Sequence, residues 1–586
     1  MTRKTREPCR TVAGAARTVV PIAYAVVAWL ACGPVRAADI HVDARNAGTE
    51  DGSTARPYRT VQGAVNQASG GDRIKIATGS YAENVRIDDM ALAFVGGYVG
   101  APPSTYGEGG TGDFSSSDPV ANPTELKGSS DAPVLHVVGS VSTTVESLRV
   151  GGGSHGIAVE GYPADSVGLT VRRCHIEGNG DPSVHGGGIW ANAVLLVEDC
   201  VVRGNVADRG AGIATGGAWS RIHRTVVEDN IAHGDHGGGI YAASRVEIVR
   251  CLVKGNRVGE QIGYGWGAGI IVFNEGTRAT IADSIVTGNH APTKGSAIFV
   301  DEGAEATIRN VLVADNECSD DGGAVYVDGA NEQIGSHATL VNVTVTGHEC
   351  GDSSDGNALL LEQASTATVE SSLFWGNGPT DVMVSQSSTL TVRYTNSTET
   401  IPGTGNLSED PLFSNPSGGD YRLQSEVGRW DVVAAQCVVD AQTSPCIDAG
   451  DPAGAFDREP DPNGSRVDMG AYGNSLAAGC AANGNGEFDV FGEPFGLDEW
   501  VGASGSGGTG AGGSGGDPGS TGGSGAASGA QGVGCEGRYS ACAHQPPSGS
   551  GSSKTAVLWL LALGLARRAT RRDRPAREVQ DAGVRQ

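Results

Sequence analysis

Three observations predict an all-β solenoid, a single-stranded right-handed parallel β-helix: a repeated strand-and-turn unit, a high glycine content and no helical period in the repeats. Glycine makes up 92 of 586 residues without a strict Gly-X-Y period, and hydrophobic residues make up 39%. The chain can therefore build a core in which glycine serves turns or linkers. The repeated units end at Asn179, Asn205, Asn230, Asn256, Asn289, Asn316 and Asn377, and His348 replaces asparagine in one further unit.

A second anchor follows each of these asparagines, a glycine-rich triplet leading into an apolar residue, as in Gly237-Gly-Gly-Ile240. Short segments of alternating apolar residues separated by glycine and asparagine turns are typical of strands. Asparagine tolerates left-handed turns and can bond the same group one coil on, so we expect an asparagine ladder. Cys174, Cys200 and Cys251 should stack as buried free thiols, because no ligand partner lies at metal-binding spacing.

The two ends of the chain have the composition of targeting segments. Residues 1–37 combine six basic residues, the apolar run 19–31 and a small-x-small site before Ala38, which predicts a signal peptide. A lipoprotein modified at Cys32 and an uncleaved N-terminal anchor are the alternatives. The apolar stretch 555–566 precedes an arginine cluster and rises only about 18 Å as a helix, short for a bilayer core of about 30 Å. These features predict an exported protein, at the cell surface (outer membrane-associated) or secreted after processing, with a membrane contact through its tail.

We accordingly expect six regions along the chain. They are a signal peptide (1–37), an N-terminal cap and first coils (38–140), parallel β-helix repeats (141–400), a C-terminal closing region (401–500), a disordered Gly/Ser-rich linker (501–553) and a C-terminal anchor or sorting tail with a short apolar helix (554–586).

Several of these motifs resemble those of known families. The pair Val313-Ala-Asp-Asn316 and Gly322-Gly-Ala-Val325 resembles the repeats of chlamydial polymorphic outer-membrane proteins and of pectate-lyase-like β-helices over about residues 140–380. The barrel of the chlamydial proteins is missing, so autotransport is not implied. The linker, the Gly534-Cys535 pair, the apolar helix and the arginines resemble in their order the sorting tails of myxobacterial surface proteins.

Two further resemblances concern the ends of the solenoid. The segment 56–85 is similar to the N-terminal cap of secreted β-helix proteins, in which Thr60 to Ala68 would form an amphipathic helix that plugs the core. Ser444 to Pro452 followed by Asp468-Met-Gly-Ala-Tyr472 resembles the closing motif of surface-anchored bacterial β-helix proteins.

The charge and motifs of the chain leave two function classes. A formal net charge of −26 disfavours nucleic acid as a partner. The first class is a non-catalytic adhesion, structural or glycan-binding module whose partner is a polysaccharide or cell-surface glycan. The alternative is a polysaccharide lyase or glycoside hydrolase acting on acidic polysaccharide, so whether the protein is an enzyme stays open. Ser154-His-Gly-Ile157 is similar to a polygalacturonase motif, but its companion motifs are missing, which favours a chance match.

Candidate catalytic residues lie four positions before the apolar anchor in successive coils. This column includes Lys294, Asp321 and Asp355, which stacking would bring about 5 Å apart at the backbone. A lyase needs a lysine or arginine base beside carboxylates that hold Ca²⁺. The alternative is an exposed ladder of ordinary compensating charges.

Candidate glycan-binding residues lie one position after the apolar anchor. Strand alternation directs this column outward, where aromatic rings can stack on sugars. The alternative is that loops cover the rings, which then form a small second core. The column and the neighbouring histidines give the candidates Trp190, Tyr241, Phe299, Tyr326, His185 and His236.

Oxygen ligands and cysteines suggest two further kinds of site. Calcium is the possible cofactor, held by Asp457, Asp461, Asn463 and Asp468 or by the oxygens of 483–489, although neither segment matches an EF-hand. Cys318 and Cys350 follow the turn position of adjacent coils and should form a disulfide. Cys437 with Cys446 and Cys535 with Cys542 are weaker local pairs.

Overall fold

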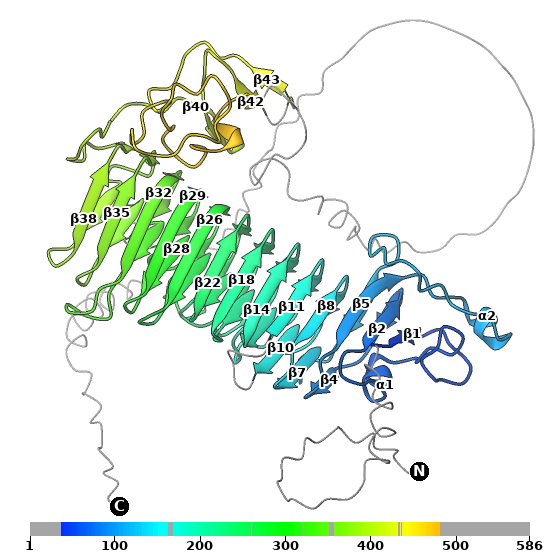
Figure 1. The fold of residues 1–586 in the computed structure, drawn as a ribbon. Coiled ribbons are helices and arrows are strands. Elements are labelled where there is room, and N and C mark those ends of the chain that lie inside the picture. The colour runs from blue at the N-terminus through cyan, green and yellow to red at the C-terminus, as the bar shows by residue number, and fades with distance from the viewer. Residues whose placement is uncertain are drawn as a thin grey trace, which may run out of the picture. The chain divides into compact units, whose positions relative to one another are not determined.

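The computed structural model describes residues 37–161, 168–259, 261–319, 322–350, 357–431, 434 and 436–480. The predicted signal peptide, Gly/Ser linker, C-terminal helix, Cys535–Cys542 pair and oxygen ligands of 483–489 lie outside these residues. Within them the chain winds as a parallel β-helix, and its strands stack one behind another from β1 to β38 (Figure 1). The all-β solenoid predicted from the repeats is confirmed.

One wall of the solenoid is a parallel sheet of 11 strands within the described residues, and its strands pair in register. Ile213, Ile240 and Ile270 stack on consecutive coils in its middle and are fully buried. The strands are β4 (Val85–Asp88), β7 (Leu135–Gly139), β10 (Ile157–Gly161), β13 (Ile189–Asn192), β17 (Ile213–Thr215), β21 (Ile240–Ala242), β25 (Ile270–Phe273), β28 (Ile298–Asp301), β31 (Val325–Val327), β34 (Leu359–Leu361) and β37 (Val382–Val384).

The remaining circumference is mostly a sheet of 22 described strands, bent at one residue per coil that has a positive φ, such as Asp283 (48°) and Asn310 (51°). The strands before the bend are β1 (Asp39–Val42), β2 (Arg73–Ala77), β5 (Ala93–Tyr98), β8 (Thr143–Glu146), β11 (Gly168–Arg172), β14 (Val194–Glu198), β18 (Trp219–His223), β22 (Arg245–Val249), β35 (Thr366–Glu370) and β38 (Thr389–Arg393). Those after it are β3 (Gly79–Tyr81), β6 (Thr124–Lys127), β9 (Arg149–Gly151), β12 (His175–Glu177), β15 (Val201–Arg203), β19 (Val226–Glu228), β23 (Leu252–Lys254), β36 (Leu373–Trp375) and β39 (Asn396–Ser397). Three long strands run through the bend: β26 (Arg278–Thr287), β29 (Glu305–Ala314) and β32 (His337–Thr346).

The predicted asparagine ladder occupies the turn after this sheet. The side-chain amide of Asn205 donates to Oδ1 of Asn230 at 3.0 Å, and that of Asn230 donates to Asn256 at 2.9 Å. The turn leads into six short described strands: β16 (Val206–Ala207), β20 (Ile231–Ala232), β24 (Arg257–Val258), β27 (His290–Ala291), β30 (Glu317–Cys318) and β33 (Glu349–Cys350). The predicted free thiols Cys174, Cys200 and Cys251 are buried in the core.

A short helix covers the N-terminal coil where the sequence predicts a cap. Helix α1 (Val61–Val65) is shorter than the expected segment from Thr60 to Ala68. The Thr60 side chain accepts a hydrogen bond from Gly63, and the Glu83 carboxylate accepts bonds from the backbone of Val61 and Gln62. The apolar side of the helix, including Val61 and Val65, is buried in the main core. A second helix, α2 (Pro103–Gly107), lies in a later turn.

The closing region packs along the side of the solenoid. The amide of Asn310 donates to the carbonyls of Ala471 and Gly473, and the amide of Asn342 donates to the carbonyl of Asp468. Both asparagines are bend residues with positive φ, so the Asp468–Tyr472 motif is held by the corner of the coils. The region contains the antiparallel pairs β40 (Phe413–Asn415) with β41 (Asp420–Leu423) and β42 (Arg429–Asp431) with β43 (Gln436–Val438), and the turns η1 (Pro416–Gly418) and η2 (Leu476–Ala478).

One predicted disulfide is present and one pairing is wrong. Cys318 and Cys350 pair in register on adjacent coils, with their Cα atoms 4.5 Å apart, and form a disulfide. Cys437 bonds to Cys480 instead of the predicted Cys446, which is a free, fully buried thiol. The reason is that Cys446 packs into an apolar cluster of the closing region, whereas Cys437 lies on β43 with its Cα atom 5.6 Å from that of Cys480.

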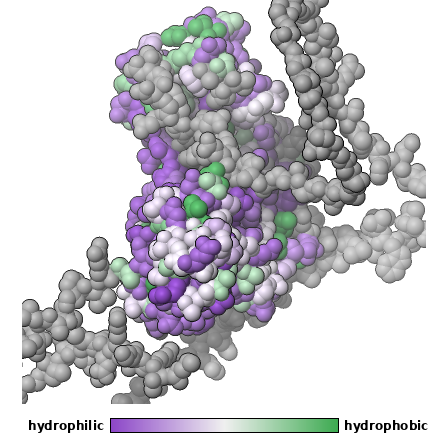
Figure 2. Space-filling model, turned by 90° about the vertical axis from the view of Figure 1, so that its right-hand side faces the viewer, coloured by the Kyte–Doolittle hydropathy of each residue, from purple (hydrophilic) through white to green (hydrophobic). Residues whose placement is uncertain are grey.

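The surface is largely polar on the side that Figure 2 views, with hydrophobic residues in small separate areas. No helix among the described residues has the length and hydropathy needed to cross a membrane.

Candidate functional site

The outward side of the 11-stranded sheet carries the column that the sequence singled out. In register, this column reads Arg86, His136, Ala158, Trp190, Ala214, Tyr241, Ile271, Phe299, Tyr326, Leu360 and Met383. Trp190 has an alanine on both neighbouring coils, Ala158 and Ala214. Small neighbours cannot cover an indole ring, and Trp190 stays partly exposed.

A pocket of about 430 Å³ lies around this tryptophan. It is lined by Pro133, His136, His155, Ala158, Glu160, His185 and Trp190. The rings of His155 and Trp190 are 6.3 Å apart, and His185 is exposed at the edge. An aromatic wall with a few convergent polar groups is the usual composition of a small-ligand site.

Hydrogen bonds fix the polar groups of this pocket. Arg86 donates to Nδ1 of His136 at 3.1 Å, which leaves Nε2 of the same ring to donate to Glu160 at 2.9 Å. The Ser154 hydroxyl lies 3.2 Å from Nδ1 of His155. Burial lowers the pKa of His155, so its ring is neutral at pH 7. The pocket therefore offers oriented hydrogen-bonding groups beside an indole.

Aromatic contacts extend the site toward β25. His185 and Tyr241 have ring centroids 6.4 Å apart, and Phe273 lies 5.7 Å from Tyr241 and 5.2 Å from His236. We call this surface the histidine–aromatic face. It comprises His136, His155, His185, Trp190, Tyr241, His236, Tyr264, Trp266 and Phe273.

Sequence reasoning missed the contribution of Tyr264 and Trp266 to this face. Tyr264 is 47% exposed, lies 5.8 Å from the Trp266 ring, and Trp266 lies 5.5 Å from His236. Both come from the loop inserted after Asn256, where the repeat lengthens to 33 residues. That longer step was the available signal, because insertions in a solenoid gather on one face.

Phe299 and Tyr326, in contrast, are not accessible to a ligand. They are 2% and 3% exposed and stack on each other at 4.7 Å, and the Lys294 ammonium lies 5.4 Å from the Tyr326 ring. Coil spacing equals the contact distance of two rings, so aromatic residues on adjacent coils cover each other. The expectation that these two rings lie open at the surface is wrong. They belong to a second small core with Tyr241, Ile271 and Leu360. Tyr241 and His236 are each only 9% exposed, so these two predicted glycan-binding residues present little surface to a ligand.

Of the three predicted catalytic residues, the structure describes Lys294. Asp321 and Asp355 lie outside the described residues. Lys294 forms an ion pair with Glu362 at 2.9 Å, and the Tyr326 hydroxyl lies 2.6 Å from Glu362 and 2.7 Å from Asp328. Burial, together with the charge of the neighbouring Glu362 carboxylate, raises the pKa of Asp328 to about 6. Sequence reasoning missed both Asp328 and Glu362. Each directly follows the last residue of its strand, β31 or β34, and these last residues pair in register.

Three of the four predicted calcium ligands gather at one place. Asp461, Asn463 and Asp468 line a pocket of about 220 Å³ together with Asp448 and Glu459, whereas Asp457 is exposed and is not among the lining residues. Burial raises the pKa of Glu459 and raises that of Asp468 strongly, and the negative charge of Asp448 acts on both groups in the same direction. In the part of the chain that the structure describes, no group of three or more His, Cys, Asp or Glu side chains is arranged to hold a metal ion. Calcium binding stays a prediction.

The comparison with family models agrees with this architecture. A family model described as "Right handed beta helix region" matches residues 129–277 and 268–405, and one described as "Disaggregatase related" matches residues 380–450. No curated protein matches the chain. Among solved structures, the pectate lyase Pel9A is 10% identical over 74% of this chain and 96% of its own, with a TM-score of 0.36. An alginate lyase from Paenibacillus sp. str. FPU-7 is 14% identical over 56% of this chain and 96% of its own, with a TM-score of 0.28. The solenoid is a right-handed parallel β-helix.

Proposed function

We propose that the protein is an exported, non-catalytic β-helix that binds a glycan along its histidine–aromatic face. The observation that carries this proposal is the pocket at Trp190, where an indole flanked by alanines lies beside oriented histidine and glutamate side chains. The apolar face of a sugar ring stacks on such an indole, and its hydroxyl groups can bond to Glu160, His155 and His185.

The extent of the face supports a polymeric ligand. Three coil steps separate β13, which carries Trp190, from β25, which carries Phe273. At about 4.8 Å per coil this is roughly 14 Å, enough for several linked sugar rings. A long glycan would therefore contact both the Trp190 pocket and the rings around His236.

Two disulfides support export. Cys318–Cys350 and Cys437–Cys480 are stable in an oxidising compartment and would be rare inside a cell. Attachment to the cell surface and contact of the tail with a membrane are part of the same proposal, and they rest on the composition of the two ends. The acidic charge argues against nucleic acid as the partner.

The second candidate, an acidic-polysaccharide lyase, rests on the cluster around Lys294. That lysine lies beside Glu362, Asp328 and Tyr326, groups that can exchange protons. Its ammonium is already committed to Glu362, and Tyr326 is buried, which disfavours the direct approach of a polymer.

Incubation of the full chain with polygalacturonate, alginate and a neutral galactan, with and without Ca²⁺, tests the two candidates together. Affinity electrophoresis reports binding, and ultraviolet absorbance reports the unsaturated ends that a lyase would leave. We expect retention by at least one polysaccharide without absorbance growth. Absorbance growth that is lost in Lys294→Ala would establish the lyase instead.

A further inference from the structure

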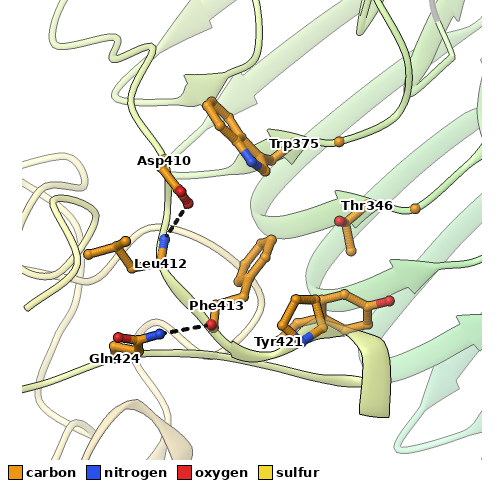
Figure 3. Close-up of a pocket in the computed structure, with 10 residues that line it drawn as sticks. Thr346, Trp375, Asp410, Leu412, Phe413, Tyr421 and Gln424 are labelled. Carbon is orange, nitrogen blue, oxygen red and sulfur yellow. Dashed lines mark hydrogen bonds between the residues drawn. The ribbon is translucent and has the colours of Figure 1, made fainter. Parts of the chain in front are cut away.

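A second pocket lies apart from the histidine–aromatic face, where the segment 410–424 packs against strands β32 and β36 (Figure 3). Its volume is about 530 Å³, within the usual range for small-molecule sites. Thr346 and Trp375 end their strands in register and form one wall, because both point away from the core of the solenoid. Residues of the closing region form the opposite wall of the pocket.

The walls of this pocket are aromatic. The ring of Phe413 projects into the space between Trp375 and Tyr421 (Figure 3). Phe413 and Tyr421 are 9% and 4% exposed, so the rings are held in place, while Trp375 stays partly exposed. The Tyr421 hydroxyl lies 3.0 Å from both oxygens of Asp315 and is therefore already engaged. The pocket offers ring surfaces of fixed orientation.

One hydroxyl group that lines the pocket has no hydrogen-bond partner in the described part of the chain. Thr346 is 4% exposed, and its hydroxyl makes no hydrogen bond among the described residues, whereas the hydroxyl of Thr344 on the same strand accepts one from Ala471. Its oxygen is not among the fully buried atoms without a partner, so it is reachable from the pocket, where a ligand or solvent can bond to it. This hydroxyl is an observation independent of the aromatic walls and also points to a polar ligand.

Two more groups are half satisfied. Asp410 accepts a hydrogen bond from Leu412 through Oδ1 at 2.9 Å, which leaves Oδ2 for a ligand. Gln424 donates from Nε2 to the carbonyl of Phe413 at 3.2 Å, which leaves Oε1 as an acceptor (Figure 3). Acceptors spaced around ring faces match a ligand that has an apolar face and several hydroxyl groups.

The charge of the pocket selects among such ligands. Asp410 is the one charged side chain of the ten that line it, and Asp315 adds a second carboxylate behind Tyr421. A uronate would place its own carboxylate near this negative charge, which is unfavourable. A neutral sugar meets no such repulsion.

We propose that this pocket is a second carbohydrate site, specific for neutral sugars, in which Trp375 and Phe413 hold the ring and Thr346, Asp410 and Gln424 bind its hydroxyl groups. The site does not depend on the glycan proposed for the histidine–aromatic face, because no lining residue is shared.

The test compares matched sugars on the full chain by saturation-transfer NMR and calorimetry. The probes are D-galactose and D-glucose against D-galacturonate and D-glucuronate. We expect the neutral sugars to bind about tenfold more tightly than their uronates, and Asp410→Asn to reduce that ratio to about two. Equal binding of the two classes by the natural protein, or binding of neither, would overturn the proposal.

Variants then locate the site. Thr346→Val keeps the side-chain shape and should weaken neutral-sugar binding about threefold, and Trp375→Ala should weaken it about tenfold or more. Trp219→Ala, at a tryptophan that is 38% exposed on β18, is the matched control and should change nothing. Trp190→Ala separates the two proposals, because it should leave this binding intact. Two results would contradict the second site. One is that Trp190→Ala abolishes all binding of neutral sugars, and the other is that Thr346→Val and Trp375→Ala bind them as tightly as the natural protein.

Discussion

The side-chain amide of Asn256 donates to Oδ1 of Asn289, one coil further along, at 2.9 Å. The same amide also donates to the carbonyl of Val227, and Oδ1 of Asn256 accepts from the backbone and the side chain of Asn230. Each asparagine of the ladder thus bonds to the coil before it and the coil after it. All of these groups are fully buried, so every bond replaces one that water would otherwise supply.

Replacing Asn256 with alanine should destabilise the protein by about 3–5 kcal/mol. The substitution leaves buried donors and acceptors on Asn230, Val227 and Asn289 without a partner, at about 1–3 kcal/mol each, with partial relaxation. Urea denaturation followed by circular dichroism measures the loss. Asn192→Ala, at an exposed position of β13, is the control and should cost less than about 0.5 kcal/mol. Equal stability of both variants would mean that the ladder contributes little.

The disulfide Cys318–Cys350 should stabilise the solenoid by about 3–4 kcal/mol. It closes a loop with a sequence separation of 32, and cross-linking restricts the unfolded chain. Replacing both cysteines with alanine should lower the denaturation midpoint by the corresponding amount. If reduction of the natural protein leaves that midpoint unchanged, the bond is not formed in solution.

Peptide mapping checks the second bridge. We expect a fragment that links Cys437 to Cys480, and Cys446 should be alkylated only after unfolding, without any reductant. A fragment that links Cys437 to Cys446 would refute the arrangement of the closing region.

Stability should fall with rising pH because of Asp301. Burial raises the pKa of this carboxyl from 3.8 to about 8, and the charges of Asp328 and Glu302 act in the same direction. Between these two values the folded protein holds a proton that the unfolded chain releases, so the free energy of unfolding decreases as pH rises through that window. The slope is at most about 1.4 kcal/mol per pH unit. Below pH 3.8 and above pH 8 the contribution of this group is constant.

Asp301→Asn isolates this effect. The amide stays neutral at every pH, so the unfolding free energy of the natural protein minus that of the variant should become more negative from pH 5 to pH 8. Denaturation curves at these two pH values give the difference directly. A difference that stays constant across this range would show that Asp301 titrates normally.

The structure of the repeated coil could be predicted from the sequence, but the contacts of long side chains and of the segments packed on the coil could not. In a solenoid, each residue stacks on the equivalent residues of the coils before and after it. The buried isoleucines, the asparagine ladder and the Cys318–Cys350 bond therefore follow from the period alone. Long side chains can also contact residues beyond the neighbouring coils. Lys294 reaches across two coils to Glu362, a partner that nearest-coil reasoning does not consider.

The openness of the candidate site was also hard to predict. A column of aromatic residues has the same sequence pattern whether its rings are exposed or covered. Whether a ring is exposed depends on the size of the residues at the same position on the neighbouring coils. Alanines beside Trp190 leave its ring accessible, whereas Phe299 and Tyr326 cover each other. The docking of Asp468–Tyr472 onto Asn310 and Asn342 joins segments more than a hundred residues apart, and no local pattern encodes it.

Glycan binding by the histidine–aromatic face is tested most directly by Trp190→Ala in calorimetric titration with the polysaccharide that the natural protein retains. Removal of the indole should weaken binding by about 1–3 kcal/mol, as for other aromatic contacts at the centre of an interface. Lys294→Ala, at a residue that is not part of this face, and Trp219→Ala, on a strand of the other sheet, should each change the binding free energy by less than about 0.5 kcal/mol. The account predicts loss of affinity in Trp190→Ala alone. Unchanged affinity in Trp190→Ala, with loss in Lys294→Ala, would contradict it.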